Sequence, residues 1–238
     1  MYIDIRCGDS FNLIKSLSDA SIDLILTDIP YDISRKNNIK TMPDRNGRNG
    51  IDFGEWDGDF DLNTLTKFIP LLKQDGGFIT FCAFEQYAEI RRILENAGLI
   101  FKDKFIWKKT NPMPRNRDRR YISNCEMGVW FIKKGGKWTF NRQNEKYQQM
   151  VFEYPSESGG GVKRYHPTQK NVKLLEELIK IHSNENDVVF DPFMGSGSTC
   201  IAAFNTGRHF IGFEKERKYY DIACNRLNEL KAVIDVQV

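Results

Sequence analysis

The pattern most informative about the architecture is Asp187-Val188-Val189-Phe190-Asp191-Pro192-Phe193-Met194-Gly195-Ser196-Gly197-Ser198-Thr199. Its apolar first part predicts a buried strand, and its glycines predict a tight turn that leads into a helix. This pattern is typical of nucleotide-binding α/β proteins, although Cys200 takes the place of the third glycine of GxGxxG. Small residues let a ligand approach the backbone closely, and they do not require that the ligand carry a pyrophosphate.

A second strand is predicted downstream, over Gly207–Phe213, and Glu214 follows it directly. An acid at this place is positioned to accept hydrogen bonds from ribose hydroxyls. Asp191, at the end of the first strand, is positioned to pair with an ammonium group, directly or through water. A ligand with a ribose and an amino-acid tail but no pyrophosphate is S-adenosylmethionine, which the sequence therefore predicts as cofactor. A purely structural strand–helix turn is the alternative.

An upstream stretch carries a second group of chemically active residues: Asp23-Leu24-Ile25-Leu26-Thr27-Asp28-Ile29-Pro30-Tyr31. Its apolar half predicts a buried strand, and Pro30 ends that strand because proline has no backbone N–H. Asp28 and Tyr31 then project beyond the carboxyl edge of the sheet, where open α/β sheets bind ligands. A carboxylate and a backbone carbonyl there suit a nucleobase amino group, and an aromatic ring suits the base itself. An ordinary strand end with a buried tyrosine is the alternative.

Length and composition bound the remaining possibilities. With 238 residues and 40% apolar content, the chain predicts one α/β domain over residues 1–238. No apolar run is long enough to span a membrane, and the first residues do not resemble a signal peptide. The five cysteines are scattered without CxxC spacing, which predicts reduced core thiols in a cytoplasmic protein. The three histidines lack metal-ligand spacing, so no metal site is predicted.

The order of elements favours a doubly wound, mostly parallel α/β sheet. Besides those above, strands are predicted over Tyr2–Arg6, Phe78–Cys82, Phe101–Trp107 and Glu126–Ile132, and helices over Ser10–Leu17, Leu62–Leu72, Glu85–Gly98 and Val172–His182. Asp9 follows the first strand, where it either caps the next helix or binds a purine amino group. Thr168 is a candidate N-cap for the helix at Val172, and the lone His166 before it has either a structural or a functional role.

Three loop regions, at about 34–56, 108–121 and 135–165, are candidates for substrate recognition. The first is rich in glycine, asparagine and cations, and it either closes over a bound nucleotide or is a surface insertion. Between Lys102 and Arg120 there are eight basic residues and two acidic ones, although the net charge of the chain is only +3. Arginines in the second loop suit contacts with phosphates or guanine edges, and a solvated loop is the alternative. The predicted DNA-binding residues are Arg35, Lys36, Asn111, Arg115, Arg117, Arg119 and Arg120.

These motifs together resemble those of the permuted (β) class of DNA amino-methyltransferases, in which the catalytic half precedes the cofactor half. The resemblance covers the chain from the first strand to the last helix. Asp28-Ile29-Pro30-Tyr31 is similar to the Asp-Pro-Pro-Tyr signature of that class, with Ile29 in place of the first proline. Asp191-Pro192-Phe193-Met194-Gly195-Ser196-Gly197 is similar to its cofactor motif, and His166-Pro167-Thr168-Gln169-Lys170 to the signature that precedes it. Three further stretches resemble those of small adenine-specific modification enzymes of type IIS restriction systems: Gly50–Asp57, Asn111–Asn116 and Asn144–Tyr147.

The resemblance implies the S-adenosylmethionine-dependent methyltransferase fold, with a seven-stranded sheet in circularly permuted order. It implies that Asp28, Ile29, Pro30 and Tyr31 are catalytic. It further implies that the cofactor is held by Asp9, Asp28, His166, Thr168, Asp191, Phe193, Gly195, Ser196, Gly197 and Glu214. The implied substrate is double-stranded DNA. A homodimer and a cognate restriction endonuclease are partners known for the class that this sequence neither supports nor excludes.

The sequence therefore predicts an enzyme that flips an adenine of a short specific site and methylates its N6 amino group. An acid at the first catalytic position favours adenine, because cytosine-N4 enzymes more often carry serine there. The alternatives are a cytosine-N4 DNA methyltransferase and a non-catalytic module that binds the cofactor or DNA, since Ile29 departs from the signature.

Overall fold

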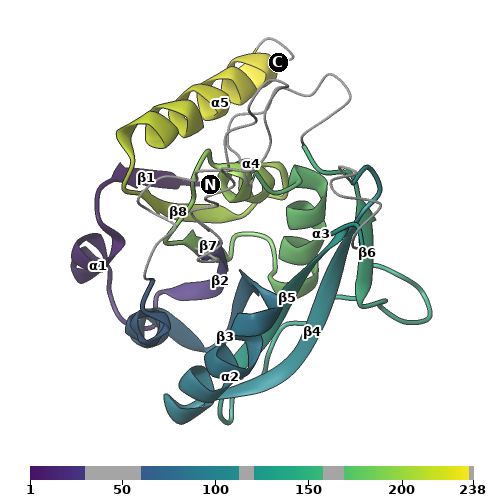
Figure 1. Cartoon of the computed structure of the whole chain (residues 1–238). Coiled ribbons are helices and arrows are strands. Elements are labelled where there is room, and N and C mark those ends of the chain that lie inside the picture. Colours follow the sequence, from purple (N-terminus) through teal and green to yellow (C-terminus); the bar gives the residue numbers. More distant parts are fainter. Residues whose placement is uncertain (30–59, 113–120, 158–168, 236–238) are drawn as a thin grey trace, which may run out of the picture.

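The computed structural model describes residues 1–29, 60–112, 121–157 and 169–235, and in these ranges helices cover both faces of an eight-stranded sheet (Figure 1). The strands are β1 (Ile3–Cys7), β2 (Ile22–Asp28), β3 (Leu72–Cys82), β4 (Leu99–Lys109), β5 (Cys125–Lys133), β6 (Val151–Tyr154), β7 (Val188–Asp191) and β8 (His209–Glu214). The α-helices are α1 (Ser10–Leu13), α2 (Tyr87–Asn96), α3 (Val172–His182), α4 (Ser198–Asn205) and α5 (Arg217–Asp235). Short 3₁₀ helices are η1 (Ile14–Ser16), η3 (Leu62–Leu71) and η4 (Phe84–Gln86).

The strand order across the sheet is β1-β8-β7-β2-β3-β5-β4-β6. All neighbouring strands are parallel except at β5, which is antiparallel to both β3 and β4. Strands from the two ends of the chain therefore lie side by side, since β2 pairs with β7 and β1 pairs with β8. The predicted doubly wound, mostly parallel sheet and its permuted order are confirmed.

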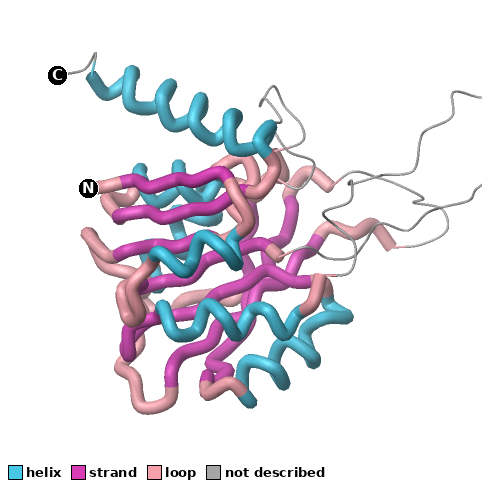
Figure 2. Tube along the Cα trace, turned by 90° about the vertical axis from the view of Figure 1, so that its left-hand side faces the viewer, coloured by secondary structure: helices cyan, strands magenta, loops and turns pink. Residues whose placement is uncertain are grey.

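Two apolar clusters hold the layers together, one on each face of the sheet. From Leu24 to Leu26 the residues of β2 alternate between the two clusters, with Leu24 and Leu26 on one face and Ile25 on the other. Ile22 packs on the same face as Ile25, because the register of β2 shifts between Ile22 and Leu24. The first cluster contains residues of α3, α4 and α5, and the second contains residues of η3 and α2. Figure 2 shows the strands side by side between these layers, with α5 along the edge near the N-terminus.

The sheet differs from the prediction by one strand. Residues 135–165 were predicted as an irregular loop, but β6 lies within this range and pairs in parallel with the end of β4. With only four residues, β6 is too short for its alternation to stand out in the sequence. The sheet therefore has eight strands in the described part of the chain, where seven were predicted.

The predicted α-helix over Leu62–Leu72 is instead the 3₁₀ helix η3, and Leu72 already belongs to β3. The hydroxyls of Thr64 and Thr66 each donate to the carbonyl three residues earlier, and Pro70 supplies no backbone N–H near the end. Both features weaken the i to i−4 pattern of an α-helix. The apolar face predicted for this segment is nevertheless buried in the second cluster.

The structure also shows where the cysteines lie and how apolar the helices are. All five cysteines lie in described residues and are free thiols, but only Cys82 and Cys200 are buried, whereas Cys7 and Cys125 are exposed. The prediction of mainly core thiols was therefore wrong for these two exposed residues. Among the helices of the described ranges, none combines the length and apolarity needed to cross a membrane.

His182, at the end of α3, is a buried histidine in an aromatic environment. Its ring centroid lies 4.4 Å from that of Trp130, and Phe140 packs edge-on against it. Within the described residues, His182 Nδ1 has no hydrogen-bond partner. Burial lowers the pKa of His182 from 6.5 to about 3, so the imidazole is neutral in the folded protein.

We expect His182→Phe to reduce the pH dependence of folding stability. As the pH falls below 6.5, the unfolded chain takes up a proton at His182 that the folded chain does not. Wild-type stability is therefore lost with falling pH, by about 2 kcal/mol at about pH 5, and the phenylalanine variant lacks this loss. Urea unfolding at about pH 8 and about pH 5 measures the difference, in which groups common to both proteins cancel. Equal losses in the two proteins would contradict the assignment.

Candidate active site

Four acids follow or end four neighbouring parallel strands. In the order of the sheet these strands are β1, β8, β7 and β2, and the acids are Asp9, Glu214, Asp191 and Asp28. Parallel strands present their carboxyl ends at one edge of a sheet, so the acids gather there although they are up to 205 residues apart (214 − 9) in the sequence. The structure thus brings together the two halves of the site that were predicted separately.

Asp191 is the most deeply buried of the four, with 3% of its surface exposed. Its Oδ1 accepts hydrogen bonds from the Thr27 hydroxyl at 2.8 Å and the Phe193 amide at 3.1 Å, and its Oδ2 accepts one from the Thr199 hydroxyl at 2.7 Å. Burial raises the pKa of Asp191 to about 6, and these donors limit the rise. The carboxylate therefore joins β2, the glycine turn and α4.

Glu214, at the end of β8, holds the glycine turn from the other side. Its Oε2 accepts a hydrogen bond from the Gly195 amide at 2.9 Å, and its Oε1 accepts one from the Glu216 amide at 2.7 Å. Burial raises the pKa of Glu214 above its usual value, with the backbone donors acting in the opposite direction. A carboxylate fixed in this way is ready to accept further bonds from ligand hydroxyls.

The two glycines of the turn have different surroundings. Both have positive φ angles, +53° at Gly195 and +80° at Gly197, which L side chains rarely adopt. A Cβ at Gly195 would meet no atom within 4 Å, whereas one at Gly197 would lie 2.8 Å from the Ala223 Cβ on α5. Gly195 therefore leaves the turn open toward a ligand, and Gly197 lets α5 pack against it. Ser196 is buried, and its carbonyl accepts a bond from Arg226 of α5 at 2.6 Å.

Asp9 and Phe193 lie at the same edge. Asp9 Oδ1 accepts hydrogen bonds from the amides of Phe11 and Asn12 at 3.0 and 3.2 Å, which confirms the N-cap of α1. Both capping bonds use one oxygen, so the cap leaves Oδ2 available to a ligand. The half-buried Phe193 packs edge-on against Phe11 and Phe60, at 6.2 and 5.4 Å between ring centroids. An apolar surface thus borders the acids.

Asp28 ends β2 and forms part of a charged group that sequence reasoning missed. Lys170 Nζ lies 2.5 Å from Asp28 Oδ2 and 2.8 Å from Glu126 Oε2, and Lys109 Nζ lies 2.5 Å from Glu126 Oε1. Lys170 precedes α3, so this contact places the start of α3 beside Asp28. A lysine next to an apolar helix is usually exposed, and no sequence signal marked this one as buried.

Some predicted site residues lie outside the described ranges, and others have contacts that differ from the prediction. Those outside are Pro30, Tyr31, Arg35, Lys36, Arg115, Arg117, Arg119, Arg120, His166 and Thr168. The N-cap of α3 is Asn171, whose Oδ1 accepts from the Leu174 amide, so the assignment of Thr168 as N-cap was wrong. Asn111 is described, and its amide group exchanges hydrogen bonds with Ser156.

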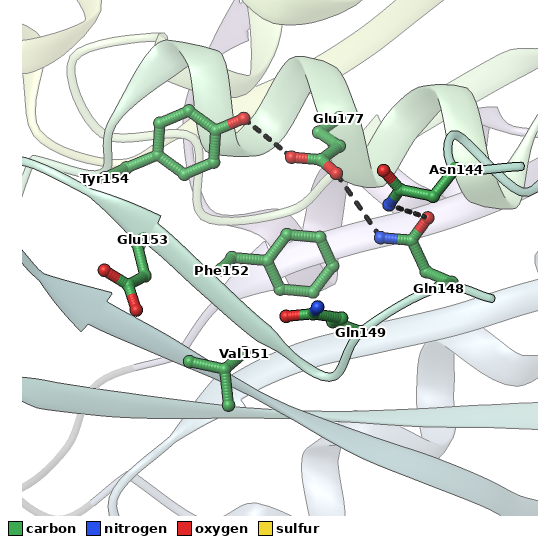
Figure 3. A pocket seen from close by; sticks show the side chains of 8 residues that line it. All are labelled: Asn144, Gln148, Gln149, Val151, Phe152, Glu153, Tyr154 and Glu177. Carbon is green, nitrogen blue, oxygen red and sulfur yellow. Dashed lines mark hydrogen bonds between the residues drawn. The ribbon is translucent and has the colours of Figure 1, made fainter. Parts of the chain in front are cut away.

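A separate depression lies between β6 and α3, with a volume of about 270 Å³ (Figure 3). Its polar side chains bond to one another: Glu177 accepts from the Tyr154 hydroxyl at 2.6 Å and from Gln148 at 3.3 Å. None of the predicted site residues lines it. In the described part of the chain, no cluster of His, Cys, Asp and Glu suits a metal ion.

The edge around the glycine turn fits S-adenosylmethionine. Gly195 gives backbone access, Glu214 and Asp9 offer carboxylate oxygens, and the negative charge of the edge is complementary to a ligand with ammonium and sulfonium groups.

Comparisons with known proteins agree with this geometry. A family of DNA methylases with N6 or N4 specificity matches residues 22–225. The chain is 33% identical to type II methyltransferase M.HinfI of Haemophilus influenzae, over 94% of this chain and 68% of that protein. It is 30% identical to type II methyltransferase M2.LlaDCHI of Lactococcus lactis subsp. cremoris, over 93% and 88%.

Solved structures give the same result. The M1.HpyAVI complex with S-adenosylmethionine superposes with a TM-score of 0.76 at 38% identity, over 95% of this chain and 99% of that one. The PvuII DNA methyltransferase, described as cytosine-N4-specific, has a TM-score of 0.71 at 20% identity over 94% and 86%, and this supports the fold alone. The cofactor of this chain is S-adenosylmethionine. Its sequence, fold and site together place the chain in the N6/N4 DNA methylase family, whose members methylate amino groups of DNA bases.

Proposed function

We propose that this enzyme methylates the N6 amino group of an adenine that is turned out of duplex DNA at a short specific site. The observation that carries the proposal is the carboxylate of Asp28, which ends β2 beside the cofactor turn and is held by Lys170. An acid at this position favours adenine over cytosine by the resemblance stated above. Turning the base out of the duplex costs a few kcal/mol.

The proposed chemistry depends on two acceptors. The amino group of adenine is a poor nucleophile because its lone pair is delocalised into the ring. Asp28 and the main-chain carbonyl of Ile29 would each accept one N–H bond, which favours a tetrahedral nitrogen with an available lone pair. Asp28 acts by position and charge in this scheme. Bound S-adenosylmethionine supplies the methyl group, activated by its positive sulfur.

The replacement of proline by Ile29 is compatible with this role. The Ile29 side chain is 2% exposed and belongs to the apolar cluster around η3 and α2. Isoleucine provides a main-chain carbonyl just as proline does, so the acceptor is retained while the side chain adds to the core. We propose that Pro30 completes the turn and that Tyr31 stacks on the base, a contact worth about 1–3 kcal/mol.

The cofactor contacts of individual residues are part of the same proposal. Asp9 would bind the adenine of S-adenosylmethionine and Glu214 its ribose, while Asp28, Asp191, Phe193 and the turn residues Gly195, Ser196 and Gly197, together with His166 and Thr168, would make the remaining contacts. The free access at Gly195 and the fixed carboxylate of Glu214 support this arrangement. Two relatives are type II methyltransferases, which supports a restriction endonuclease as functional partner. The homodimer stays a prediction to be checked by sedimentation.

Product analysis tests the function directly. The protein is incubated with labelled S-adenosylmethionine and unmethylated genomic DNA, and the DNA is digested to nucleosides and separated by chromatography. We expect label in N6-methyldeoxyadenosine. Label in N4-methyldeoxycytidine would keep the mechanism but refute the choice of base, and cofactor binding without any incorporation would favour the non-catalytic alternative.

Asp28→Asn tests the proposed catalytic acid. We expect methyl transfer to fall by at least about 100-fold, because the amide retains the shape but offers one acceptor without the charge. DNA affinity should change little, which a fluorescence anisotropy titration measures. Asp19→Asn, at an exposed position between η1 and β2, is the matched control. Retained turnover in the Asp28 variant would contradict the assignment.

The predicted DNA contacts are tested through their salt dependence. Arg115→Gln and Arg119→Gln should each weaken DNA binding and reduce the slope of log affinity against log salt by about one. The measurement is a DNA-binding titration at several salt concentrations. An unchanged slope would show that the arginine in question makes no phosphate contact.

A further inference from the structure

Lys170 is a buried lysine at the catalytic edge that the proposed chemistry does not yet use. Its side chain is 6% exposed, and its ammonium group lies between the carboxylates of Asp28 and Glu126, at 2.5 and 2.8 Å. The ammonium also lies 5.0 Å from the centre of the Phe81 ring, on the strand next to β2. Two carboxylates and an aromatic face thus fix the position of one cation.

The contacts continue to a fourth charge. Glu126, on β5, also binds Lys109 at the end of β4, so that negative and positive charges alternate along Asp28, Lys170, Glu126 and Lys109. The group is neutral as a whole, and its members come from β2, β4, β5 and the segment before α3. Each ion has an opposite charge beside it, which offsets the cost of taking it out of water.

Both central members of the group are charged in the folded protein. Burial acts to lower the pKa of Lys170, but Asp28 and Glu126 outweigh it and raise that pKa above its usual value. Burial acts to raise the pKa of Glu126, but Lys170 and Lys109 lower it to about 2. An ammonium ion is therefore held against Asp28 throughout the range of pH in which the enzyme would work.

A buried ion pair is weak evidence for a role in stability, because apolar side chains of similar volume often fill such a site equally well. A role in orienting Asp28 explains the arrangement better. A carboxylate at the end of a strand can turn about its side-chain bonds, and the contact at Oδ2 fixes that rotation. The direction of Oδ1 is then set as well.

We propose that Lys170 is a positioning residue that keeps Asp28 ionised and directs its second oxygen toward the amino group of the base. This proposal rests on the proposed function, since it assigns Asp28 the same role. It predicts that the positive charge of Lys170 lowers the pKa of Asp28 and that the negative charge of Glu126 raises it.

Several charged or titratable groups besides Lys170 face Asp28. Asp191 on β7 lies close enough that the charge of Asp28 helps to raise its pKa, after burial. Cys82 on β3 has a pKa raised to about 12 by burial and by Asp28, so it stays a neutral thiol. Glu126 on β5 acts through Lys170. These groups are unchanged in a Lys170 variant and cancel in a comparison with the wild type.

The first experiment measures the ionisation of the Asp28 carboxyl directly and does not depend on methyl transfer. Carbon-13 NMR follows the side-chain carboxyl of Asp28, assigned by its loss in Asp28→Asn, as the pH is varied in the full-length protein. We expect Lys170→Met to move the titration of Asp28 upward by at least about one pH unit, because the stabilising cation is gone. Glu126→Gln should move it downward, because a repelling negative charge is gone. Lys170→Arg should resemble the wild type.

The second experiment measures kcat and KM of methyl transfer with the same variants. Lys170→Met should lower kcat by at least about tenfold with a smaller change in KM, because Asp28 is no longer oriented, and the loss should be greatest at acidic pH, where Asp28 becomes protonated in the variant first. Lys170→Arg should restore most of kcat. Lys173→Met is the matched control, since Lys173 lies on α3, three residues after Lys170, is 70% exposed and pairs with the carboxylate of Glu176.

Either of two results would overturn the proposal: an unchanged titration of Asp28 in Lys170→Met, or shifts of the same sign in the Lys170→Met and Glu126→Gln variants. If Lys170→Met does not fold, as circular dichroism would show, Lys170→Gln takes its place in the titration, with the same expected upward shift. Absence of methyl transfer by the wild type would refute the proposed function, and the NMR titration would still decide whether Lys170 controls Asp28.

Discussion

The site depends on the buried carboxylate of Asp191, which connects parts of the chain that are far apart in sequence. It accepts hydrogen bonds from Thr27 on β2, from the Phe193 amide in the glycine turn and from Thr199 on α4. Thr27 directly precedes Asp28, so this carboxylate sets the position of the end of β2 relative to the glycine turn. Its burial is costly, and three donors from three elements offset the cost only when all of them are in place. The two halves of the site are thereby fixed together.

The permuted chain order has a simple consequence for this connection. The strand β2, which ends in Asp28, comes early in the chain, and β7, which leads into the glycine turn, comes late, yet they are direct neighbours in the sheet. The contacts between them therefore span more than 160 residues, as in the bond from Thr27 to Asp191. Such distant contacts form only when the sheet assembles, so the two halves of the site are joined only in the folded domain.

Sequence patterns predicted those parts of the molecule that local rules determine. The glycine turn, the acids at strand ends and the bounds of α3 follow from periodicity and residue type, and the structure confirms their placement. The errors arose where a tertiary contact decided the outcome. Asn171 rather than Thr168 caps α3, and β6 exists because β4 offers it a partner. The contact of Lys170 with Asp28 joins residues 142 positions apart, and no pattern within one segment contains that information.

The charges of the edge explain why the acids can gather there. Carboxylates at four neighbouring strand ends repel one another, and each is stabilised in a different way. Amides of α1 stabilise Asp9, and the amides of Gly195 and Glu216 stabilise Glu214. Two hydroxyls and an amide stabilise Asp191, and Lys170 stabilises Asp28. Fixed donors of this kind cost nothing to reorganise when a ligand binds. The edge keeps its negative charge, and a ligand with a positive sulfur and an ammonium group reduces the remaining repulsion. Asp28 differs from the other three acids because the charged group of a lysine stabilises it. Under the proposed function this difference has a reason, since a base amino group is neutral and requires an Asp28 whose charge and direction are already set.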